Sequence, residues 1–150
     1  MELKLSGCCV VPGQAEGEAL VMSQSISFFG GVDPGTGCIT DRRHELFGRS
    51  LAGKVAVFPF GKGSCAGSLI MLELVRIGKA PAAIVNIKTE PILATAPIIS
   101  KHFYGKSIPM LALDEGGFKK IKTGQHIIVD AMKGHIWINE RLEIKKPTRN

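Results

Sequence analysis

The amino-acid sequence predicts an α/β fold in a single domain, with a β-rich half formed by both ends of the chain and a βαβαβα centre. Short apolar runs bounded by glycine and proline near both ends are typical of strands. Between them, apolar runs alternate with segments of helical periodicity. The 150 residues are enough for one hydrophobic core, and 45% hydrophobic against 21% charged residues is the composition of a folded protein.

The first thirty residues are expected to form strands joined in hairpins. An apolar run at 3–11 ends at Pro12 and Gly13, and further apolar groups follow at 19–22 and 26–29. The next segment, 30–53, contains six glycines, which are too many for a helix. A loop of this length inside a compact domain is usually functional, so we expect it to contribute to a site.

The centre of the chain begins with a predicted strand at 54–60, which leads into a glycine turn. A helix is predicted over 65–77, because its apolar residues recur at helical spacing while Glu73 and Arg76 share a polar face. Gly78 and the following Pro81 mark the end of this helix.

The remaining elements follow from the same signals. In order, they are a strand at 82–87, a helix at 91–102, a strand at 108–113, a short helix at 115–121 and a terminal hairpin of 125–131 and 134–138. Pro91 suits the first turn of its helix, whereas Pro97 is expected to break or kink the interior.

The net charge of +6 makes nucleic acid a partner to consider. However, the basic excess lies in a tail at 139–150, and only 6% of residues are aromatic, so we expect no nucleic-acid partner. No apolar run approaches the roughly 20 residues of a membrane span, and the N-terminus lacks a signal-peptide pattern, so a cytoplasmic protein without membrane contact is expected. The cysteines form no CxxC pair, and no metal site held by this chain alone is expected; they are Cys8, Cys9, Cys38 and Cys65.

The segment most informative about function is 60–68, between a predicted strand and a predicted helix. The first amides of a helix are unpaired and its dipole is positive there, so this turn can hold an anion or stabilise an oxyanion on Ser64. Gly61 and Gly63 let the backbone approach a ligand closely. A serine at this position is equally the ordinary N-cap of the helix, and both interpretations remain open on spacing alone.

Three known motifs do not fit this turn. A Walker A loop requires Gly-Lys-Ser/Thr at its end, whereas Lys62 is followed by Gly63. A nucleophile elbow requires glycine two residues on either side of Ser64, where Lys62 and Ala66 stand. The glycines match a dinucleotide-binding fingerprint only loosely, because their spacing differs from it.

Two segments carry a resemblance to a known family: FFGGVDPGTGCITDRRHELFGRSLAGKVAVFPFGKGSCAGS at 28–68 and ELVRIGKAPAAIVNIKTEPILATAPIIS at 73–100. They resemble the small subunit, or swivel domain, of the aconitase X family, and the resemblance extends from about residue 7 to residue 138. It implies a swivelling β/β/α domain of the aconitase superfamily that is inactive alone. A separate large subunit, in a heterodimer or larger assembly, would supply an iron–sulfur cluster or iron and most contacts to a hydroxy acid substrate.

The resemblance also implies roles for individual residues. Ser64 would be the catalytic base of a hydro-lyase. The substrate-binding residues would be Gly61, Lys62, Gly63, Cys65 and Ser68, and the long loop would contribute Gly30, Gly31, Asp33, Asp41 and His44. Asp33 and Asp41 have an alternative role, as turn residues that bind their own backbone.

The turn departs from the pattern of aconitases at two positions. Aconitases carry a second serine and then an arginine after the base, whereas this chain has Cys65 and Ala66. The cation that holds the substrate carboxylate must therefore come from elsewhere. The candidates in this chain are Lys62, Arg42 and Arg43, and the large subunit is the other possible source.

Two substrates are known for this family. Its members dehydrate either cis-3-hydroxy-L-proline, giving Δ1-pyrroline-2-carboxylate, or (R)-5-phosphomevalonate. The stretch at 98–110 resembles bacterial members, which act on hydroxyproline, so the sequence favours cis-3-hydroxy-L-proline and leaves 5-phosphomevalonate as the alternative. A swivel module that binds an anion or a protein without catalysis is the further alternative.

Overall fold

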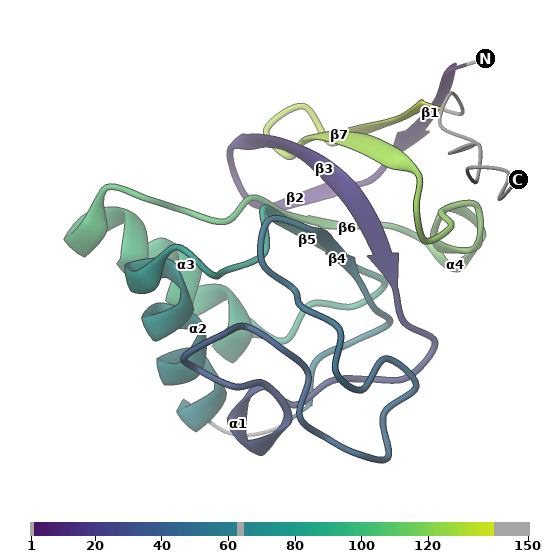
Figure 1. The fold of residues 1–150 in the computed structure, drawn as a ribbon. Helices are drawn as coiled ribbons and strands as arrows, with labels where there is room; N and C mark the ends of the chain where they lie inside the picture. Colours follow the sequence, from purple (N-terminus) through teal and green to yellow (C-terminus); the bar gives the residue numbers. More distant parts are fainter. Residues whose placement is uncertain (1, 63–64, 140–150) are drawn as a thin grey trace, which may run out of the picture.

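The computed structural model describes residues 2–62 and 65–139. Its elements, drawn in Figure 1, are β1 Glu2–Ser6, β2 Cys8–Val11, β3 Gln14–Val21, α1 Phe28–Gly31, β4 Val55–Val57, α2 Cys65–Ile77, β5 Ala83–Asn86, α3 Pro91–Tyr104, β6 Met110–Ala112, α4 Glu115–Lys119, β7 His126–Asp130 and β8 His135–Asn139. The order from β4 to α4 is the predicted βαβαβα centre, and strands from both ends of the chain complete the α/β fold.

The strands form one mixed sheet in the order β1-β8-β7-β3-β4-β5-β6-β2. Strand β3 belongs to both halves of this sheet. Its residues 14–18 pair antiparallel with β7, and its residues 19–21 pair parallel with β4. The β4–β5 and β5–β6 pairs are also parallel, as expected for strands connected through helices.

The central strands are buried on both faces, which gives the molecule three layers. Val55 and Val57 of β4 point into a core shared with the β1, β7 and β8 half of the sheet. Ala56 and the following Phe58 point into a second core beneath the helices. This alternation follows the two-residue period of a strand. The layers are therefore β/β/α, as the family resemblance implies.

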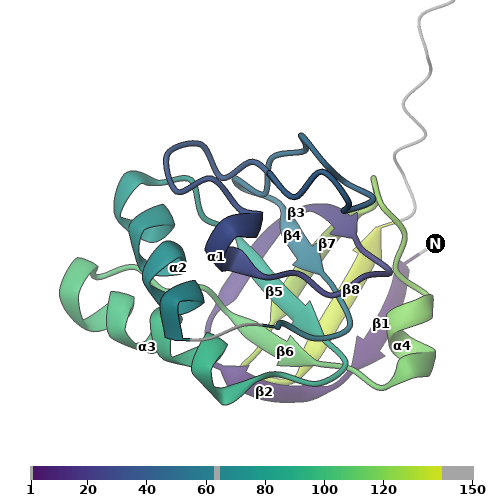
Figure 2. The same ribbon diagram turned by 90° about the horizontal axis from the view of Figure 1, so that it is seen from below.

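Helices α2 and α3 lie side by side over one face of the sheet, and α4 lies at the opposite end of the molecule (Figures 1 and 2). The predicted bounds of α2 are confirmed. It buries Met71, Leu74 and Val75 against the sheet, and Gly78 ends it with a φ of 74° and an amide that donates to the Val75 carbonyl at 3.2 Å.

The predicted hairpins within the first thirty residues are wrong. Strand β1 pairs with β8, β2 pairs with β6, and β3 pairs with β7 and β4. The sequence predicts which residues favour strands, but the partner of each strand is selected by burial against distant segments. The apolar group at 26–29 is also not a strand, because Phe28 begins the short helix α1.

The predicted break at Pro97 is also wrong, since α3 continues through it to Tyr104. Pro97 is buried, and its carbonyl accepts hydrogen bonds from the hydroxyls of Ser100 at 3.0 Å and Ser107 at 3.1 Å. These contacts hold the Pro97 carbonyl in place, although they do not replace the hydrogen bond to the Leu93 carbonyl that proline cannot donate. Helix α3 ends at Gly105, which has a φ of 66°.

The other predicted boundaries hold to within a few residues, and the terminal hairpin of β7 and β8 is confirmed. Apart from Asn139, which ends β8, the predicted basic tail at 139–150 lies outside the described residues. None of the described helices combines the length and hydropathy that crossing a membrane requires.

The turn between β7 and β8 yields a prediction for stability. Gly134 has a φ of 71°, and a Cβ there would collide with the Gly7 carbonyl oxygen. Gly105 has a similar φ of 66° but open space around it. We expect Gly134→Ala to lower the free energy of unfolding by about 3 kcal/mol and the control Gly105→Ala by about 1 kcal/mol. Denaturant titration measures both, and equal losses would contradict the predicted clash.

Candidate functional site

The described part of the glycine turn, Gly61 and Lys62, follows β4 and is attached to a distant segment of the chain. Gly61 forms a parallel bridge with Ile26, and the Lys62 amide donates to the Ile26 carbonyl at 3.0 Å. Helix α2 begins at Cys65. The predicted roles of Gly63 and Ser64 fall outside the described residues.

Three cavities surround this turn, and Lys62 lines all of them. We call them the turn cavity, the polar cavity and the loop cavity. The turn cavity is lined by Ile26, Phe28, Gly61, Lys62, Gly67, Ser68, Glu90, Ile92 and Leu93. The polar cavity is lined by Gln24, Ser25, Asp41, Arg43, His44 and Lys62. The loop cavity is lined by Ser27, Phe29, Gly30, Gly31, Thr40, Asp41, Arg42, Arg43 and Lys62.

Most of the predicted site residues therefore lie around Lys62. Gly61 and Ser68 line the turn cavity, and the loop residues line the other two. Of the predicted site residues that the structure describes, two do not line any of these cavities. Cys65 is exposed at the start of α2, and Asp33 lies in a turn of its own.

The Ser68 hydroxyl is occupied by contacts within the protein. It donates to the Ile92 carbonyl at 2.7 Å and receives a hydrogen bond from Thr95 at 3.4 Å. Ile92 and Thr95 lie in α3, so Ser68 connects α2 to the first turns of α3. Its position beside the turn cavity leaves a contact to a ligand possible, in addition to this connection.

The aspartates of the loop bind their own backbone. Asp33 accepts hydrogen bonds from the amide of Gly35 and the hydroxyl of Thr36, both at 2.9 Å, and these two bonds lower its pKa. Asp41 accepts a hydrogen bond from the Arg43 backbone amide at 3.0 Å, and its Oδ1 lies 3.6 Å from the Arg43 Nε. The hydrogen bond from the backbone amide is the main cause of the lowered pKa of Asp41. Asp41 differs from Asp33 in lining two of the cavities.

Positive charge dominates the polar and loop cavities, whereas the turn cavity is lined by one cation, Lys62, and one carboxylate, Glu90. Lys62, Arg42 and Arg43 line the polar and loop cavities, and of the ion pairs among the described residues only the Asp41–Arg43 pair involves any of these cations. Lys62 and Arg42 therefore have no paired carboxylate within the described part of the chain. A site with this balance is suited to an anionic ligand.

A clamp centred on Glu45 was not predicted from the sequence. The Glu45 carboxylate accepts the Ser23 hydroxyl at 2.9 and 2.8 Å, the Gln24 amide at 3.0 Å and the Ser23 amide. In return, the Glu45 amide donates to the Gln24 side chain at 2.9 Å. These bonds hold the loop that contains Asp41 and His44 against the segment that leads to Ile26. No sequence spacing indicates this contact, because its partners are more than twenty residues apart.

His44 is the most buried of the polar residues that line the cavities, with 8% of its surface exposed. Its Nδ1 accepts the Leu46 amide at 3.1 Å. Its Nε2 is buried and has no hydrogen-bond partner among the described residues.

Comparison with known proteins identifies the family. Residues 4–138 match the aconitase X swivel domain family. This chain belongs to that family. The crystal structure of Thermococcus kodakaraensis aconitase X, in its holo-form, superposes with a TM-score of 0.83 at 44% sequence identity, over 92% of this chain and 99% of that chain.

Two curated relatives of this swivel domain are named phosphomevalonate dehydratase small subunit. The protein from Thermococcus kodakarensis is 45% identical over 138 residues, which are 92% of this chain and 98% of the relative. The protein from Methanosarcina acetivorans is 43% identical over 135 residues, 89% of this chain and 90% of the relative. This swivel domain is thus the small subunit of an aconitase X-family dehydratase, a hydro-lyase, and a small subunit implies a large one.

The described residues of the swivel domain offer no group of three or more histidine, cysteine or carboxylate side chains that could hold a metal ion. Cys8 and Cys9 lie in β2, Cys38 lies in the long loop, and Cys65 begins α2. An iron–sulfur cluster requires several thiolates around one centre. The donors described in this chain do not fit such a cluster by themselves.

The Glu45 clamp yields a prediction for pH dependence. Partial burial raises the pKa of the Glu45 carboxyl, but the hydrogen bonds from Gln24 and Ser23 outweigh it and hold that pKa below its ordinary value of 4.5. Because the folded-state pKa is lowered, the clamp stabilises the protein above pH 4.5 and is lost as pH falls through the folded-state pKa.

We therefore expect the Ser23 and Gln24 amide resonances to titrate in NMR spectra with a midpoint below pH 4.5. Glu45→Gln should abolish this titration, whereas Glu115→Gln, on α4 away from the clamp, should leave it intact. Unchanged titration of both amides in Glu45→Gln would show that another group is responsible.

Proposed function

We propose that this chain is the small subunit of a phosphomevalonate dehydratase. The observation that carries the proposal is the identity of 43 to 45%, over nearly the whole chain, to curated relatives that bear this name. These relatives favour 5-phosphomevalonate, the alternative of the sequence analysis, over cis-3-hydroxy-L-proline.

The stretch that pointed to hydroxyproline is 98–110, which covers the second half of α3 and the segment leading into β6. It lines none of the three cavities around Lys62. Its sequence is therefore a poor indicator of the substrate.

The proposed reaction removes water from a 3-hydroxy acid. A base takes a proton from the carbon beside the carboxylate, hydroxide leaves the neighbouring carbon, and a double bond forms between the two. We assign the base to Ser64, following the family resemblance. A serine can act as a base only where its oxyanion is stabilised, and Lys62 together with the start of α2 can supply that stabilisation.

The substrate carries a carboxylate and a phosphate, and the polar and loop cavities carry the matching positive charge. Lys62 lies between the cavities and can reach an anion in any of them. Arg42 and Arg43 line the loop cavity. Aconitases carry an arginine where this chain has Ala66. Lys62, Arg42 and Arg43 would supply the positive charge that is missing at that position.

The rest of the active site would belong to the large subunit. We assign to it the iron–sulfur cluster or iron, because the described donors of this chain do not fit one. That group would assist the departure of the hydroxyl. The swivel domain would bring Ser64 and Lys62 to a substrate held by its partner, so neither subunit is expected to turn over substrate alone.

The test of this function is an anaerobic dehydration assay of both subunits together, with both candidate substrates. We expect turnover of phosphomevalonate that requires both chains. Ser64→Ala should lower kcat by roughly 10²- to 10⁴-fold with little change in KM, because a general base is lost. The control Ser107→Ala, whose hydroxyl binds the Pro97 carbonyl away from the turn, should leave kcat unchanged.

A second variant distinguishes the two roles of Ser64 that its spacing leaves open, catalytic base and helix N-cap. Asparagine caps helices as well as serine does but has no hydroxyl to deprotonate. Ser64→Asn should therefore fold and remain inactive, and recovered activity would reduce Ser64 to a helix cap. Turnover of cis-3-hydroxy-L-proline alone would replace the proposed substrate, and a stable complex inactive on both would favour a non-catalytic binding module.

Exposed apolar side chains around the turn support a partner that covers it. Phe29 lines the loop cavity and Ile92 the turn cavity, and they are 62% and 41% exposed. Phe60 and Leu69 adjoin Gly61 and Ser68 in the sequence and are 48% and 66% exposed. Apolar groups of this size around a charged site are typical of an interface. We therefore propose that the large subunit binds over this surface.

Leu69→Asp tests this interface. A buried carboxylate in its centre should weaken binding to the large subunit by at least about tenfold, while the exposed position leaves folding intact. Met132→Asp is the matched control, since Met132 is 69% exposed in the β7–β8 turn. Affinity measured by calorimetry or co-purification should fall for Leu69→Asp only; equal affinities for the two variants would rule out the interface.

A further inference from the structure

The buried ring of His44 carries a hydrogen-bond donor that nothing described in the chain uses. Its Nδ1 accepts the Leu46 amide at 3.1 Å, so in the neutral ring the proton is on Nε2. Nε2 is buried and has no partner among the described residues. Buried polar atoms are nearly always paired in proteins, and an unpaired one calls for a specific explanation. The missing partner must be a hydrogen-bond acceptor.

The groups beside His44 indicate what kind of acceptor is missing. His44 lines the polar cavity together with Lys62 and Arg43, which are cations, and with Gln24 and Ser25. Among its described lining residues the one carboxylate is Asp41, whose Oδ1 accepts the Arg43 amide at 3.0 Å. Positive charge therefore exceeds negative charge around this cavity. A ligand with several negatively charged oxygens would satisfy this arrangement.

We propose that the polar cavity binds the phosphate group of the substrate, with Lys62 and Arg43 neutralising its charge. His44 Nε2–H is covered in the free domain, and a small displacement of the ring on binding would let it donate to a phosphate oxygen. This inference rests on the proposed function. In phosphomevalonate the carboxylate adjoins the carbon that loses a proton and must lie beside the base, whereas the phosphate is at the other end of the molecule. The polar cavity extends from Lys62, next to the turn, to His44 and Asp41 in the long loop.

The Glu45 clamp prepares this cavity for a ligand. Its hydrogen bonds join Ser23 and Gln24 to the residue next to His44. Both sides of the polar cavity are thereby held together before a ligand arrives. A preformed site loses less conformational entropy on binding than a flexible one.

The experiment compares variants of the complete two-subunit enzyme in phosphate-free buffer. His44→Gln should raise the KM for phosphomevalonate roughly 10- to 100-fold, with kcat nearly unchanged, because a hydrogen bond to a charged group is lost or misplaced. Competitive inhibition by inorganic phosphate should weaken in the same proportion. Inhibition by mevalonate, which has the carboxylate and hydroxyl but no phosphate, should not change.

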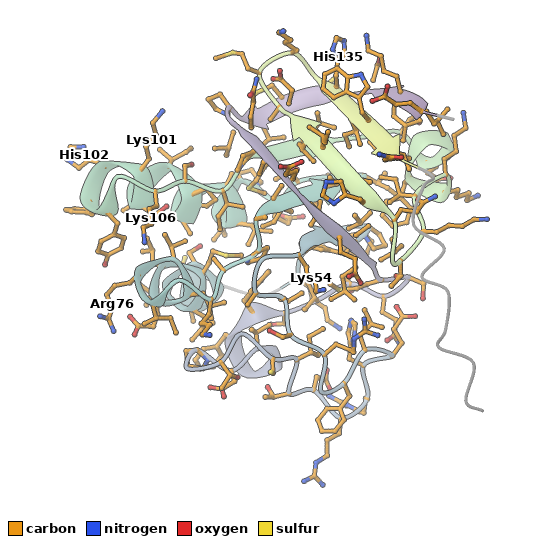
Figure 3. All side chains as sticks on the ribbon, turned by 45° about the horizontal axis from the view of Figure 1, so that its top comes forward. Lys54, Arg76, Lys101, His102, Lys106 and His135 are labelled. Carbon is orange, nitrogen blue, oxygen red and sulfur yellow. The ribbon has the colours of Figure 1, made fainter. Side chains whose placement is uncertain are left out.

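Matched controls replace the same residue types elsewhere. His135→Gln changes a histidine on β8, and Lys101→Ala changes a lysine on α3; Figure 3 shows that these two residues lie on different sides of the molecule. Both variants should keep the original KM. An unchanged KM in His44→Gln, or equal losses for phosphomevalonate and mevalonate, would overturn the phosphate site.

Two further outcomes remain decisive. If His44→Gln does not fold or assemble, Arg43→Ala replaces it, because the Arg43 side chain is 93% exposed and its loss does not affect the core; an unchanged KM there overturns the proposal. If the enzyme turns over cis-3-hydroxy-L-proline and not phosphomevalonate, the proposed function fails. Inhibition by inorganic phosphate then decides separately whether the cavity binds phosphate, and absence of inhibition overturns it.

Discussion

The backbone contact between Ile26 and the glycine turn is the interaction on which the site depends. The bond from the Lys62 amide to the Ile26 carbonyl attaches the turn after β4 to the segment before α1. The edge-to-face contact of Phe28 with Phe58, whose ring centroids are 6.3 Å apart, supports the same junction from the core. Backbone bonds and buried rings thus fix the position of Lys62, which lines all three cavities.

The three cavities differ in polarity and are formed by different parts of the fold. The turn cavity is partly apolar and lies against α2 and α3, whereas the polar and loop cavities are formed by loop segments rich in positive charge. The rigid layers thus position the turn, and the loops supply the charge. Ionic pairs also occur on the regular elements, such as Glu73 with Arg76 on α2 and Glu16 with His126 between β3 and β7, but these pairs line none of the three cavities.

The sequence predicted the parts of the molecule that depend on local signals. The bounds of α2 follow from apolar spacing and from Gly78, and both are encoded within a few residues of the helix. The pairing of β1, β2 and β3 and the Glu45 clamp were not predicted, because each joins segments that are distant in the chain, whereas the hairpin of β7 and β8 joins neighbouring segments and was predicted. Pro97 was misjudged for a related reason, since the contacts that support it include Ser107, beyond the end of the helix.

The pairing of the first strand with the last determines how the chain can fold. Residues Glu2 and Asn139 are register partners in β1 and β8, so the sheet spans almost the full length of the chain. Contacts of such high sequence separation form slowly, and β1 has no partner until β8 has been synthesised. Completion of the sheet is therefore a late folding event. A truncation that removes β8 would also leave the N-terminal strand unpaired, so each end of the chain protects the other against aggregation through an open edge.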